Sequence, residues 1–443
     1  MYFLYSCVSS VALLVVSPWL AWQAWRHDKY RHSLRERLGR LSAKVNPAGH
    51  PCLWIHAVSV GEVLAVRALL PGLHARYADL PVFVSTTTRT GRQVAETQLE
   101  GIDGLFYFPL DFAFSVRRVL ARLRPRLVVL VETEIWPRLL HECRRRDVPV
   151  MLINARVSDR SFPRYRAVRP LLRHVLSGFA RLCAQSSRSA ERLLAMGAPP
   201  DRVTVTGSLK FDALDWTLVD RGVTHPVLRH FVGAATRPVL LAASTLRGED
   251  ALVLDAFTAV RADHPDALLV LVPRHPERFD EVTSLAQTRP LNVARRTALP
   301  PDLPLTADVV VVDTMGELAA LFGLATVVFV GGSLVDGGGH NVLEPALFAK
   351  AIVVGPSMHN FPEISAAFLE AGAMVQVPDG AGLTQAMVGL FNAPPRRATL
   401  GAAARGLLDR HRGAASRTLE EIARVLPPSP ATPVAPSAAG RVH

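Results

Sequence analysis

Several residues in the first half of the chain could take part in proton transfer at a hydroxyl group. Glu62 follows the apolar run at residues 52–56 and stands where a helical pattern begins, so its carboxylate could act as a general base. Glu132 and Glu134 follow the apolar run at residues 127–131, and buried carboxylates are costly unless they have a partner or a task. The alternatives are that Glu62 only stabilises a helix start and that Glu134 only forms a structural ion pair.

Cationic side chains in the same half could meet negative charge on a substrate. Lys210, in the segment 207–212, follows the last apolar run of this half and could stabilise a phosphate or a sugar carboxylate. Arginines crowd residues 154–173, with Phe162 and Tyr165 between them, and guanidinium groups suit phosphates. This group comprises Arg156, Arg160, Arg164, Arg166, Arg169 and Arg173. The alternative for part of the group is a solvated basic face.

The second half of the chain carries candidates for nucleotide binding. Arg274 and His275 follow one apolar run, at residues 267–272. The run at residues 309–312 is followed by Met315, Gly316 and Glu317. The chain contains no G-x-x-x-x-G-K-[ST] segment, and no G-x-G-x-x-G opens its first half, which argues against an ATPase and a dehydrogenase.

A glycine-rich stretch after residues 326–330 predicts a phosphate site. Glycines at 331–332 and 337–339 let backbone N–H groups approach a phosphate, and the helix start that follows favours its charge. Directly behind these glycines come His340, Asn341, Val342, Leu343 and Glu344. The carboxylate of Glu344 could accept hydrogen bonds from ribose hydroxyl groups, and the neighbouring glycines favour a functional over a structural role for His340.

All these candidates follow short apolar runs that predict buried strands. In the first half the runs are 52–56, 82–85, 127–131, 150–153 and 203–206, with helical patterns at 67–77, 116–123 and 137–146 between them. In the second half they are 239–243, 267–272, 309–312, 326–330 and 351–354. Strands without polar alternation, separated by helices, predict parallel sheets covered on both faces. We therefore expect two Rossmann-like domains facing across a cleft, joined by a linker around residues 214–238, with ligands at the carboxyl ends of the strands.

Size and charge agree with two domains and an anionic partner. The chain has 443 residues and a formal net charge of +12, and its four scattered cysteines fit neither a disulfide framework nor a zinc site. Residues 1–210 hold 31 basic and 15 acidic residues, whereas the remainder holds 19 and 23. A basic first half predicts a nucleic acid, anionic lipid or phosphorylated substrate as its partner.

The first 25 residues predict a membrane anchor. They contain no charged side chain, and Trp19, Trp22 and Trp25 would suit the interfacial belt. The start lacks the basic residues and the cleavage site of a signal peptide, which favours an uncleaved anchor. A basic segment follows, with Arg26, Lys29, Arg31, Arg35, Arg37, Arg40 and Lys44. Positive charge stays on the cytoplasmic side, so we expect a cytoplasmic body and favour lipid over nucleic acid as the anionic partner.

The chain resembles the Kdo transferases, where Kdo is 3-deoxy-D-manno-oct-2-ulosonic acid. The resemblance rests on Val-Gly-Glu at 60–62, Glu-Thr-Glu-Ile-Trp-Pro at 132–137, Asn-Ala-Arg-Val-Ser-Asp-Arg-Ser-Phe at 154–162, Leu-Lys-Phe-Asp at 209–212, Pro-Arg-His-Pro-Glu-Arg-Phe at 273–279, Met-Gly-Glu-Leu at 315–318 and Gly-Gly-His-Asn-Val-Leu-Glu-Pro at 338–345. These segments keep their order and spacing from the anchor to about residue 365.

The resemblance implies transfer of Kdo from CMP-Kdo to a lipid A precursor in lipopolysaccharide synthesis, on a GT-B fold of class α/β. It implies that Glu62 is the base, that Glu132 and Lys210 support the transition state, and that no metal or other cofactor is needed. It places the CMP pocket at Arg274, His275, Met315, Gly316, Glu317, Asn341, Val342, Leu343 and Glu344. The reaction would be an inverting single displacement.

The resulting domain prediction has five segments. They are a membrane anchor helix at 1–25, a basic juxtamembrane segment at 26–50, an acceptor-binding domain at 51–220, a CMP-sugar-binding domain at 221–426 and a disordered tail at 427–443. The predicted location is the cell inner membrane, with lipid A precursor, CMP-Kdo and membrane lipid as partners and no nucleic acid. Two alternatives stay open: a membrane-associated GT-B transferase that uses a UDP-sugar, and an inactive lipid-binding scaffold.

Overall fold

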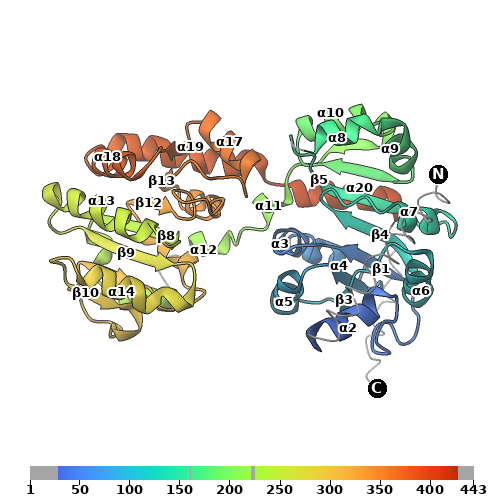
Figure 1. Cartoon of the computed structure of the whole chain (residues 1–443), viewed down its shortest axis with the longest axis horizontal. Helices are drawn as coiled ribbons and strands as arrows, with labels where there is room; N and C mark the ends of the chain where they lie inside the picture. Colours follow the sequence, from blue (N-terminus) through green and yellow to red (C-terminus); the bar gives the residue numbers. More distant parts are fainter. Residues whose placement is uncertain (1–27, 160, 221–224, 428–443) are drawn as a thin grey trace, which may run out of the picture. The chain divides into compact units, whose positions relative to one another are not determined.

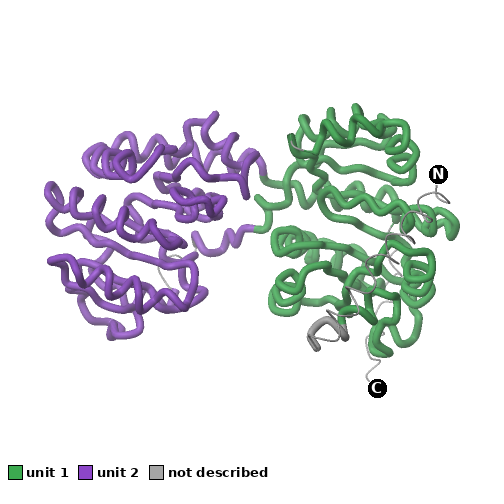
Figure 2. Tube along the Cα trace, viewed as in Figure 1, with its two compact units in different colours: residues 1–213, 412–443 green, residues 214–411 purple. Residues whose placement is uncertain are grey.

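The computed structural model describes residues 28–159, 161–220 and 225–427. It divides into two compact units, which Figure 2 shows in different colours. Of the described residues, unit 1 comprises those up to Ala213 and again those from Arg412, and unit 2 comprises those between Leu214 and His411. The predicted anchor at 1–25 lies outside the described residues, as does nearly all of the predicted tail. No helix among those that the structure describes is long and apolar enough to cross a membrane.

Unit 1 is built on a seven-stranded parallel sheet with the strand order β3-β2-β1-β4-β5-β6-β7 (Figure 1). Its strands are β1 (Cys52–His56), β2 (Val82–Thr86), β3 (Gly104–Tyr107), β4 (Pro125–Val131), β5 (Val150–Ala155), β6 (Arg181–Ala184) and β7 (Val203–Val205). The helices are α2 (Asp28–Arg37), α3 (Val60–Arg67), α4 (Leu70–Arg76), α5 (Arg89–Gln98), α6 (Ala113–Leu123), α7 (Pro137–Arg144), α8 (Phe162–Ala167), α9 (Arg169–Leu176), α10 (Ser187–Ala195), α11 (Leu209–Asp212) and α20 (Ala414–Val425).

The sheet of unit 1 is buried on both faces because its strands carry apolar residues at successive positions. In β1, Cys52 and Trp54 belong to one apolar cluster, whereas Leu53 and Ile55 belong to another. This division follows from the alternation of side chains along a strand. Helices α6, α7, α9 and α10 contribute to the first cluster, and α3, α4, α5 and α20 to the second. The prediction of a parallel sheet covered on both faces is confirmed for this unit.

Unit 2 contains a second seven-stranded parallel sheet, with the order β10-β11-β9-β8-β12-β13-β14. Its strands are β8 (Val239–Thr245), β9 (Leu268–Pro273), β10 (Val293–Arg295), β11 (Val309–Val311), β12 (Val327–Val330), β13 (Ala351–Val354) and β14 (Val375–Gln376). The helices are α12 (Thr217–Asp220), α13 (Glu249–Asp263), α14 (Phe279–Gln287), α15 (Leu318–Leu321), α16 (Leu343–Leu347), α17 (Pro362–Glu370), α18 (Gly380–Phe391) and α19 (Pro394–His411). Both units thus have the Rossmann-like arrangement that the sequence predicts.

The division of the chain differs from the predicted domain boundaries at two places. Unit 1 ends at Ala213 rather than at residue 220, and the chain returns to it at Arg412, whereas the prediction assigns everything up to residue 426 to the second domain. The returning helix α20 buries Leu419 and Ile422 in the second apolar cluster of unit 1. A Cβ atom on Gly72 would lie 2.2 Å from Leu419 Cδ1, so the helix packs closely against α4. Burial of this apolar face against distant strands explains the return.

Four short strands were missed by the sequence prediction, namely β3, β6, β10 and β14. Two of them, β10 and β14, have only three and two residues and lie at the edges of their sheet. Residues in β10 are half-buried, so this strand lacks the continuous apolar run that marks a central parallel strand.

Candidate functional site

The first group of candidate residues lies where the strand order of unit 1 changes direction. Strand β1 pairs with β2 on one side and with β4 on the other, and ligands of open parallel sheets bind at such a point, outside the carboxyl ends of the strands. Glu62 lies in the first turn of α3, just after β1, and is buried at 5% exposure. Its Oε2 accepts a hydrogen bond from the N–H of Val58 (2.7 Å) and its Oε1 accepts one from Ser59 Oγ (2.8 Å). The carboxylate is therefore held in one orientation.

Glu132 and Lys210 form an ion pair in the same region. Lys210 Nζ lies 3.2 Å from Glu132 Oε1, and both side chains are about one quarter exposed. Glu132 directly follows β4 and has φ +62°, a left-handed conformation that is uncommon for a residue with a side chain. A Cβ atom on Gly61 would lie 4.0 Å from Lys210 Cε, which places the lysine stem beside the residue that precedes Glu62. The structure thus brings together the three residues predicted as catalytic.

The local electrostatics favour a proton on the carboxyl groups near neutral pH. The pKa of Glu62 is raised to about 7, chiefly by burial and also by the negative charges of Glu132 and Glu134. The hydrogen bond from the N–H of Val58 opposes this rise. Burial likewise raises the pKa of Glu134 to about 7, and the nearby indole N–H of Trp136 opposes the rise. Carboxyl groups with pKa values near the working pH are suited to general acid–base chemistry.

Asn154 is a residue of this site that sequence reasoning did not single out. It is fully buried at the end of β5, with φ +51°, and its Oδ1 accepts the N–H of Leu209 (3.0 Å). Leu209 begins helix α11, which carries Lys210 on its next residue. The amide of Asn154 therefore fixes the position of the lysine through the backbone. A buried asparagine at a strand end was the available signal.

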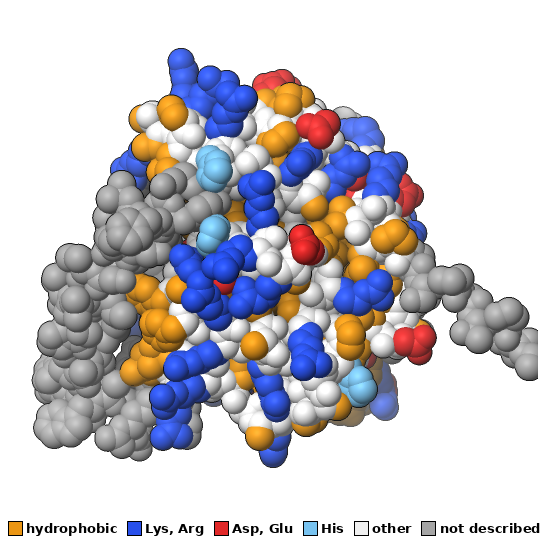
Figure 3. Space-filling model, turned by 90° about the vertical axis from the view of Figure 1, so that its right-hand side faces the viewer, with side chains coloured by type: hydrophobic (Ala, Val, Ile, Leu, Met, Phe, Trp, Pro, Cys, Tyr) orange, Lys and Arg blue, Asp and Glu red, His pale blue; other side chains and the backbone are white. Residues whose placement is uncertain are grey.

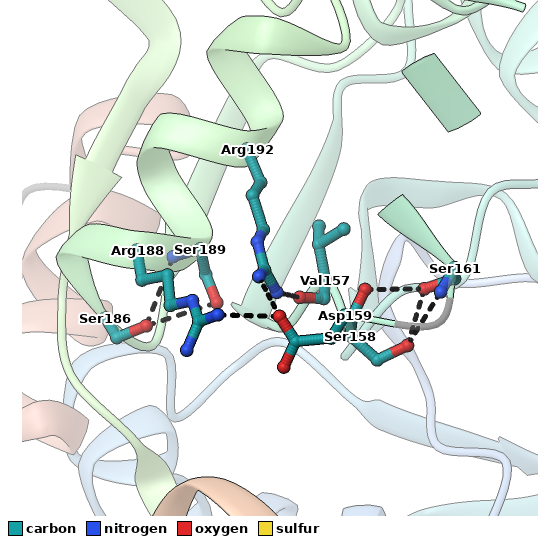
Figure 4. Close-up of polar contacts among 8 residues, drawn as sticks. All are labelled: Val157, Ser158, Asp159, Ser161, Ser186, Arg188, Ser189 and Arg192. Carbon is teal, nitrogen blue, oxygen red and sulfur yellow. Dashed lines mark hydrogen bonds and ion pairs between the residues drawn. The ribbon is translucent and has the colours of Figure 1, made fainter. Parts of the chain in front are cut away.

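The arginines between residues 154 and 173 differ in exposure, since Arg156 is half-buried and Arg160 lies outside the described residues. Those on α8 and α9 are exposed, namely Arg164, Arg166, Arg169 and Arg173. Figure 3 shows one face of unit 1, on which Lys and Arg side chains gather and acidic side chains are few. In the neighbouring loop, Asp159 forms ion pairs with Arg188 and Arg192, as Figure 4 shows. These four exposed side chains can be reached by either an anionic partner or solvent, as the sequence left open.

Candidate donor-site residues in unit 2 lie at the carboxyl ends of adjacent strands. The order β11-β9-β8-β12 puts the loops after these four strands side by side at one sheet edge, because all their pairings are parallel. Arg274 and His275 follow β9. The pKa of His340, which follows β12, is lowered to about 4, chiefly by burial and also by the positive charges of Arg274 and His275. The loop after β9 therefore lies close enough to the loop after β12 for its charge to act on the imidazole of His340.

The remaining predicted donor-site residues lie in the same row of loops. Met315 is 62% exposed after β11, and Gly316 has φ +88°, a conformation that suits glycine. Glu317 accepts two hydrogen bonds from Arg296, at 2.9 and 2.7 Å, so its carboxylate is already bound to a cation. Asn341 donates from Nδ2 to Glu344 Oε1 (3.0 Å). Its Oδ1 accepts the N–H of Leu343 and so shapes the turn before α16.

Part of the glycine-rich stretch differs from the predicted phosphate site. The N–H groups of Gly332, Ser333 and Leu334 donate to the carboxylate of Glu249, at 2.7, 3.0 and 2.9 Å. A carboxylate of the chain itself thus occupies these donors, and a phosphate would have to bind elsewhere in the loop. Sequence reasoning did not single out Glu249, because the N–H groups that it accepts follow β12, more than 80 residues later in the chain. No group of three His, Cys, Asp or Glu side chains suited to a metal ion occurs within residues 28–427, the undescribed positions excepted.

Comparisons with known proteins identify the family of the chain. A family model described as 3-deoxy-D-manno-octulosonic-acid transferase (kdotransferase) matches residues 32–213. A 3-deoxy-D-manno-octulosonic acid transferase of Haemophilus influenzae is 35% identical over 403 residues, which cover 89% of this chain and 92% of that protein. One of Bordetella pertussis is 35% identical over 429 residues, covering 94% and 98%.

Solved structures support the fold. UDP-GlcNAc 2-epimerase from Neisseria meningitidis, bound to UDP-GlcNAc, is similar with a TM-score of 0.57 and 14% identity, covering 85% of this chain and 100% of that one. At this identity the likeness concerns the fold alone. The two parallel Rossmann-like sheets agree with this fold, and the two transferases match the chain over nearly their whole length. The chain belongs to the 3-deoxy-D-manno-octulosonic acid transferase family and has the GT-B architecture of glycosyltransferases.

Proposed function

We propose that the protein transfers Kdo from CMP-Kdo to a hydroxyl group of a lipid A precursor. The observation that carries the proposal is the grouping of a buried carboxyl group, Glu62, with the ion pair between Glu132 and Lys210 at the carboxyl ends of β1 and β4. A base and a cation beside each other suit the activation of a hydroxyl group and the stabilisation of negative charge. Membership of the Kdo transferase family supplies the sugar.

The proposed reaction is a single displacement that inverts the anomeric carbon. The ionised carboxylate of Glu62 takes the proton of the acceptor hydroxyl group, and the acceptor oxygen forms the new bond to the anomeric carbon. The bond from that carbon to the phosphate oxygen breaks, and its electron pair leaves with CMP. Lys210 stabilises negative charge that develops on the reacting groups, and Glu132 holds the ammonium group in place.

On the donor side, the proposal assigns CMP to the strand-end loops of unit 2. The guanidinium group of Arg274 and the imidazole of His275 are the donors available to the phosphate, and the turn from Asn341 to Glu344 is available to the ribose. The exposed arginines of α8 and α9 suit the phosphates of the lipid acceptor. We also propose that residues 1–25 anchor the protein in the inner membrane with its body on the cytoplasmic side, on the strength of the charge pattern alone.

The test incubates detergent-solubilised full-length protein with tetraacyl lipid A precursor and either CMP-Kdo or UDP-sugars, and reads the products by mass spectrometry. We expect a mass gain of one or more Kdo units with CMP-Kdo and none with UDP-sugars. Transfer from a UDP-sugar alone would replace the proposed donor. Absence of any transfer by folded protein, with CMP-Kdo shown to be intact, would favour the inactive scaffold.

The pH dependence of transfer should reflect the carboxyl groups of unit 1. Because Glu62 must be ionised to act as a base and its pKa is raised to about 7, kcat/KM should fall as the pH drops below about 7. Glu134→Gln removes one of the negative charges that raise this pKa, so the fall should move to lower pH. The pH profiles of the two proteins check this. Because the pKa of Glu134 is also raised to about 7, the acid limb of the unaltered protein reflects the titration of Glu62 and Glu134 together.

A matched control is Glu96→Gln, which removes an exposed carboxylate that pairs with Arg92 on the same helix. Its pH profile should coincide with that of the unaltered protein. An unchanged profile for Glu134→Gln, or an equal shift for both variants, would contradict the assignment of the acid limb to Glu62.

A further inference from the structure

One acidic side chain in unit 2 occupies a ring of backbone donors with no exposure to solvent. Glu249 is the first residue of α13 and is 0% exposed. Its Oε2 accepts the N–H groups of Leu246 (2.8 Å) and Gly332 (2.7 Å), and its Oε1 accepts those of Ser333 (3.0 Å) and Leu334 (2.9 Å). Four backbone donors around one anion are the arrangement in which proteins bind phosphate or carboxylate ligands. Here the ligand is part of the chain.

The loop that Glu249 holds supports the next part of the donor site. The N–H of Gly339 donates to the carbonyl oxygen of Gly332 (2.7 Å). A Cβ atom on Gly332 would lie only 2.9 Å from His340 Nε2, so the imidazole packs directly on this loop. The segment that leads into Asn341 is thus built on the backbone that Glu249 fixes.

The next residue, Asp250, fixes the loop after β9 through the side chains of Arg278 and Thr245. Asp250 is 2% exposed, forms an ion pair with the buried Arg278 and accepts a hydrogen bond from Thr245 Oγ1 (2.6 Å). The carbonyl oxygen of Thr245 accepts the N–H of Arg274 (3.0 Å) and Nη1 of Arg278 (3.1 Å). Two consecutive residues at the start of α13 therefore fix the loops that follow β8, β9 and β12.

We propose that Glu249 is a positioning residue of the donor site, whose carboxylate fills the N–H ring at Gly332–Leu334 permanently and so keeps the donor phosphate out of it. The phosphate is then received by Arg274, His275 and the later part of the glycine-rich stretch, 337–344. The inference rests on the proposed function, because it takes unit 2 to bind CMP. Strand order supports the location, since β8 and β12 are the pair at which the order of unit 2 changes direction.

The chemistry of the side chain explains why a carboxylate is required. Each carboxylate oxygen of Glu249 accepts two hydrogen bonds, and the start of α13 also favours negative charge. A glutamine has the same size but only one accepting atom, and its NH₂ group would face two of the four N–H donors. Buried donors left without acceptors are costly, so Glu249→Gln should shift the Gly332–Leu334 loop rather than leave it in place.

The first experiment measures CMP binding by calorimetry for the full-length protein and for Glu249→Gln. We expect the Kd for CMP and the KM for CMP-Kdo to rise about 10- to 100-fold, as for other residues that orient a binding site, while the KM for the lipid acceptor stays unchanged. In Glu249→Ala, added acetate should restore part of the CMP affinity by entering the vacated ring. Asp379→Asn is the matched control, since Asp379 also accepts a backbone N–H at a helix start of unit 2, that of Gly382 (2.8 Å). It should bind CMP normally.

A second measurement needs no variant and covers the case in which Glu249→Gln does not fold. Hydrogen exchange of the unaltered protein should find the amides of Gly332, Ser333 and Leu334 protected without CMP, with little change on its addition. Low protection that rises with CMP would show that the ring receives the donor phosphate, and the inference would be wrong. Equal CMP affinity of Glu249→Gln and the unaltered protein would also overturn it, whereas absence of CMP binding by the unaltered protein would overturn the proposed function.

Discussion

Glu62→Gln should abolish most transfer activity, lowering kcat by a factor of about 10² to 10⁴, the range that general base catalysis contributes. The amide keeps the size of the side chain and can still accept the hydrogen bond of Val58, so the backbone around the start of α3 should stay in place. It cannot accept a proton from the acceptor hydroxyl group. The measurement is a single-turnover assay with CMP-Kdo and lipid A precursor, together with CMP binding and the melting temperature.

Binding of CMP should be unaltered in Glu62→Gln, because no carboxylate is lost from unit 2. The melting temperature should not fall, because the raised pKa of Glu62 means that the folded protein disfavours its ionised form. Ser59→Ala is a useful companion, since it removes only the hydroxyl donor to Glu62 Oε1. Losing that donor should raise the pKa of Glu62 and move the acid limb of kcat/KM upward, with little loss of rate at high pH. Full activity of Glu62→Gln would remove Glu62 from the reaction and leave the base unassigned.

Lys210→Met should lower kcat by about 10² to 10³, the cost of removing one group that stabilises charge in a transition state. The variant keeps an unbranched side chain as far as the Cε atom that lies beside Gly61, but removes the ammonium group. It also leaves Glu132 without the cation that lies 3.2 Å from its Oε1. We expect kcat to fall while the Kd for CMP changes little, as measured by steady-state kinetics and calorimetry on the same preparations.

Two comparisons separate loss of charge stabilisation from loss of structure. Lys350→Met removes an ammonium group that donates to the carbonyl oxygen of Gly323 in unit 2, and it should leave kcat unchanged. Lys210→Met combined with Glu132→Gln should cost less than the two separate effects added together, because the residues form one pair. Additive effects would mean that Lys210 and Glu132 act independently of each other.

The sequence by itself determined the fold class and most of the central strands. Apolar runs of four to six residues without polar alternation predicted β1, β2, β4 and β5 in one half and β8, β9, β12 and β13 in the other. This worked because a strand covered on both faces must be apolar at every position. The same reasoning located Glu62, Glu132 and Lys210, since each stands directly behind such a run or at the helix start that follows it, where parallel sheets gather their side chains.

Tertiary structure alone decided which of these residues have a partner. The ion pair of Lys210 with Glu132 joins positions 78 residues apart, and the hydrogen bond from the N–H of Leu209 to Asn154 joins positions 55 residues apart. Neither contact follows from a local pattern, because each depends on the order in which strands lie in the sheet. The return of helix α20 to unit 1 is of the same kind. Its apolar face is visible in the sequence, but the strands that cover it are not.

The glycine-rich stretch gives the clearest contrast between what the sequence predicts and what the tertiary structure decides. Its composition predicts backbone N–H groups open to an anion, and the folded chain has such a ring of donors at Gly332–Leu334. The anion in that ring is Glu249, which lies more than 80 residues earlier in the chain. Sequence can indicate that a segment is able to bind negative charge. Which negative charge binds there depends on the order of the strands. In this protein β8 lies beside β12, so the start of α13, which follows β8, lies next to the loop after β12.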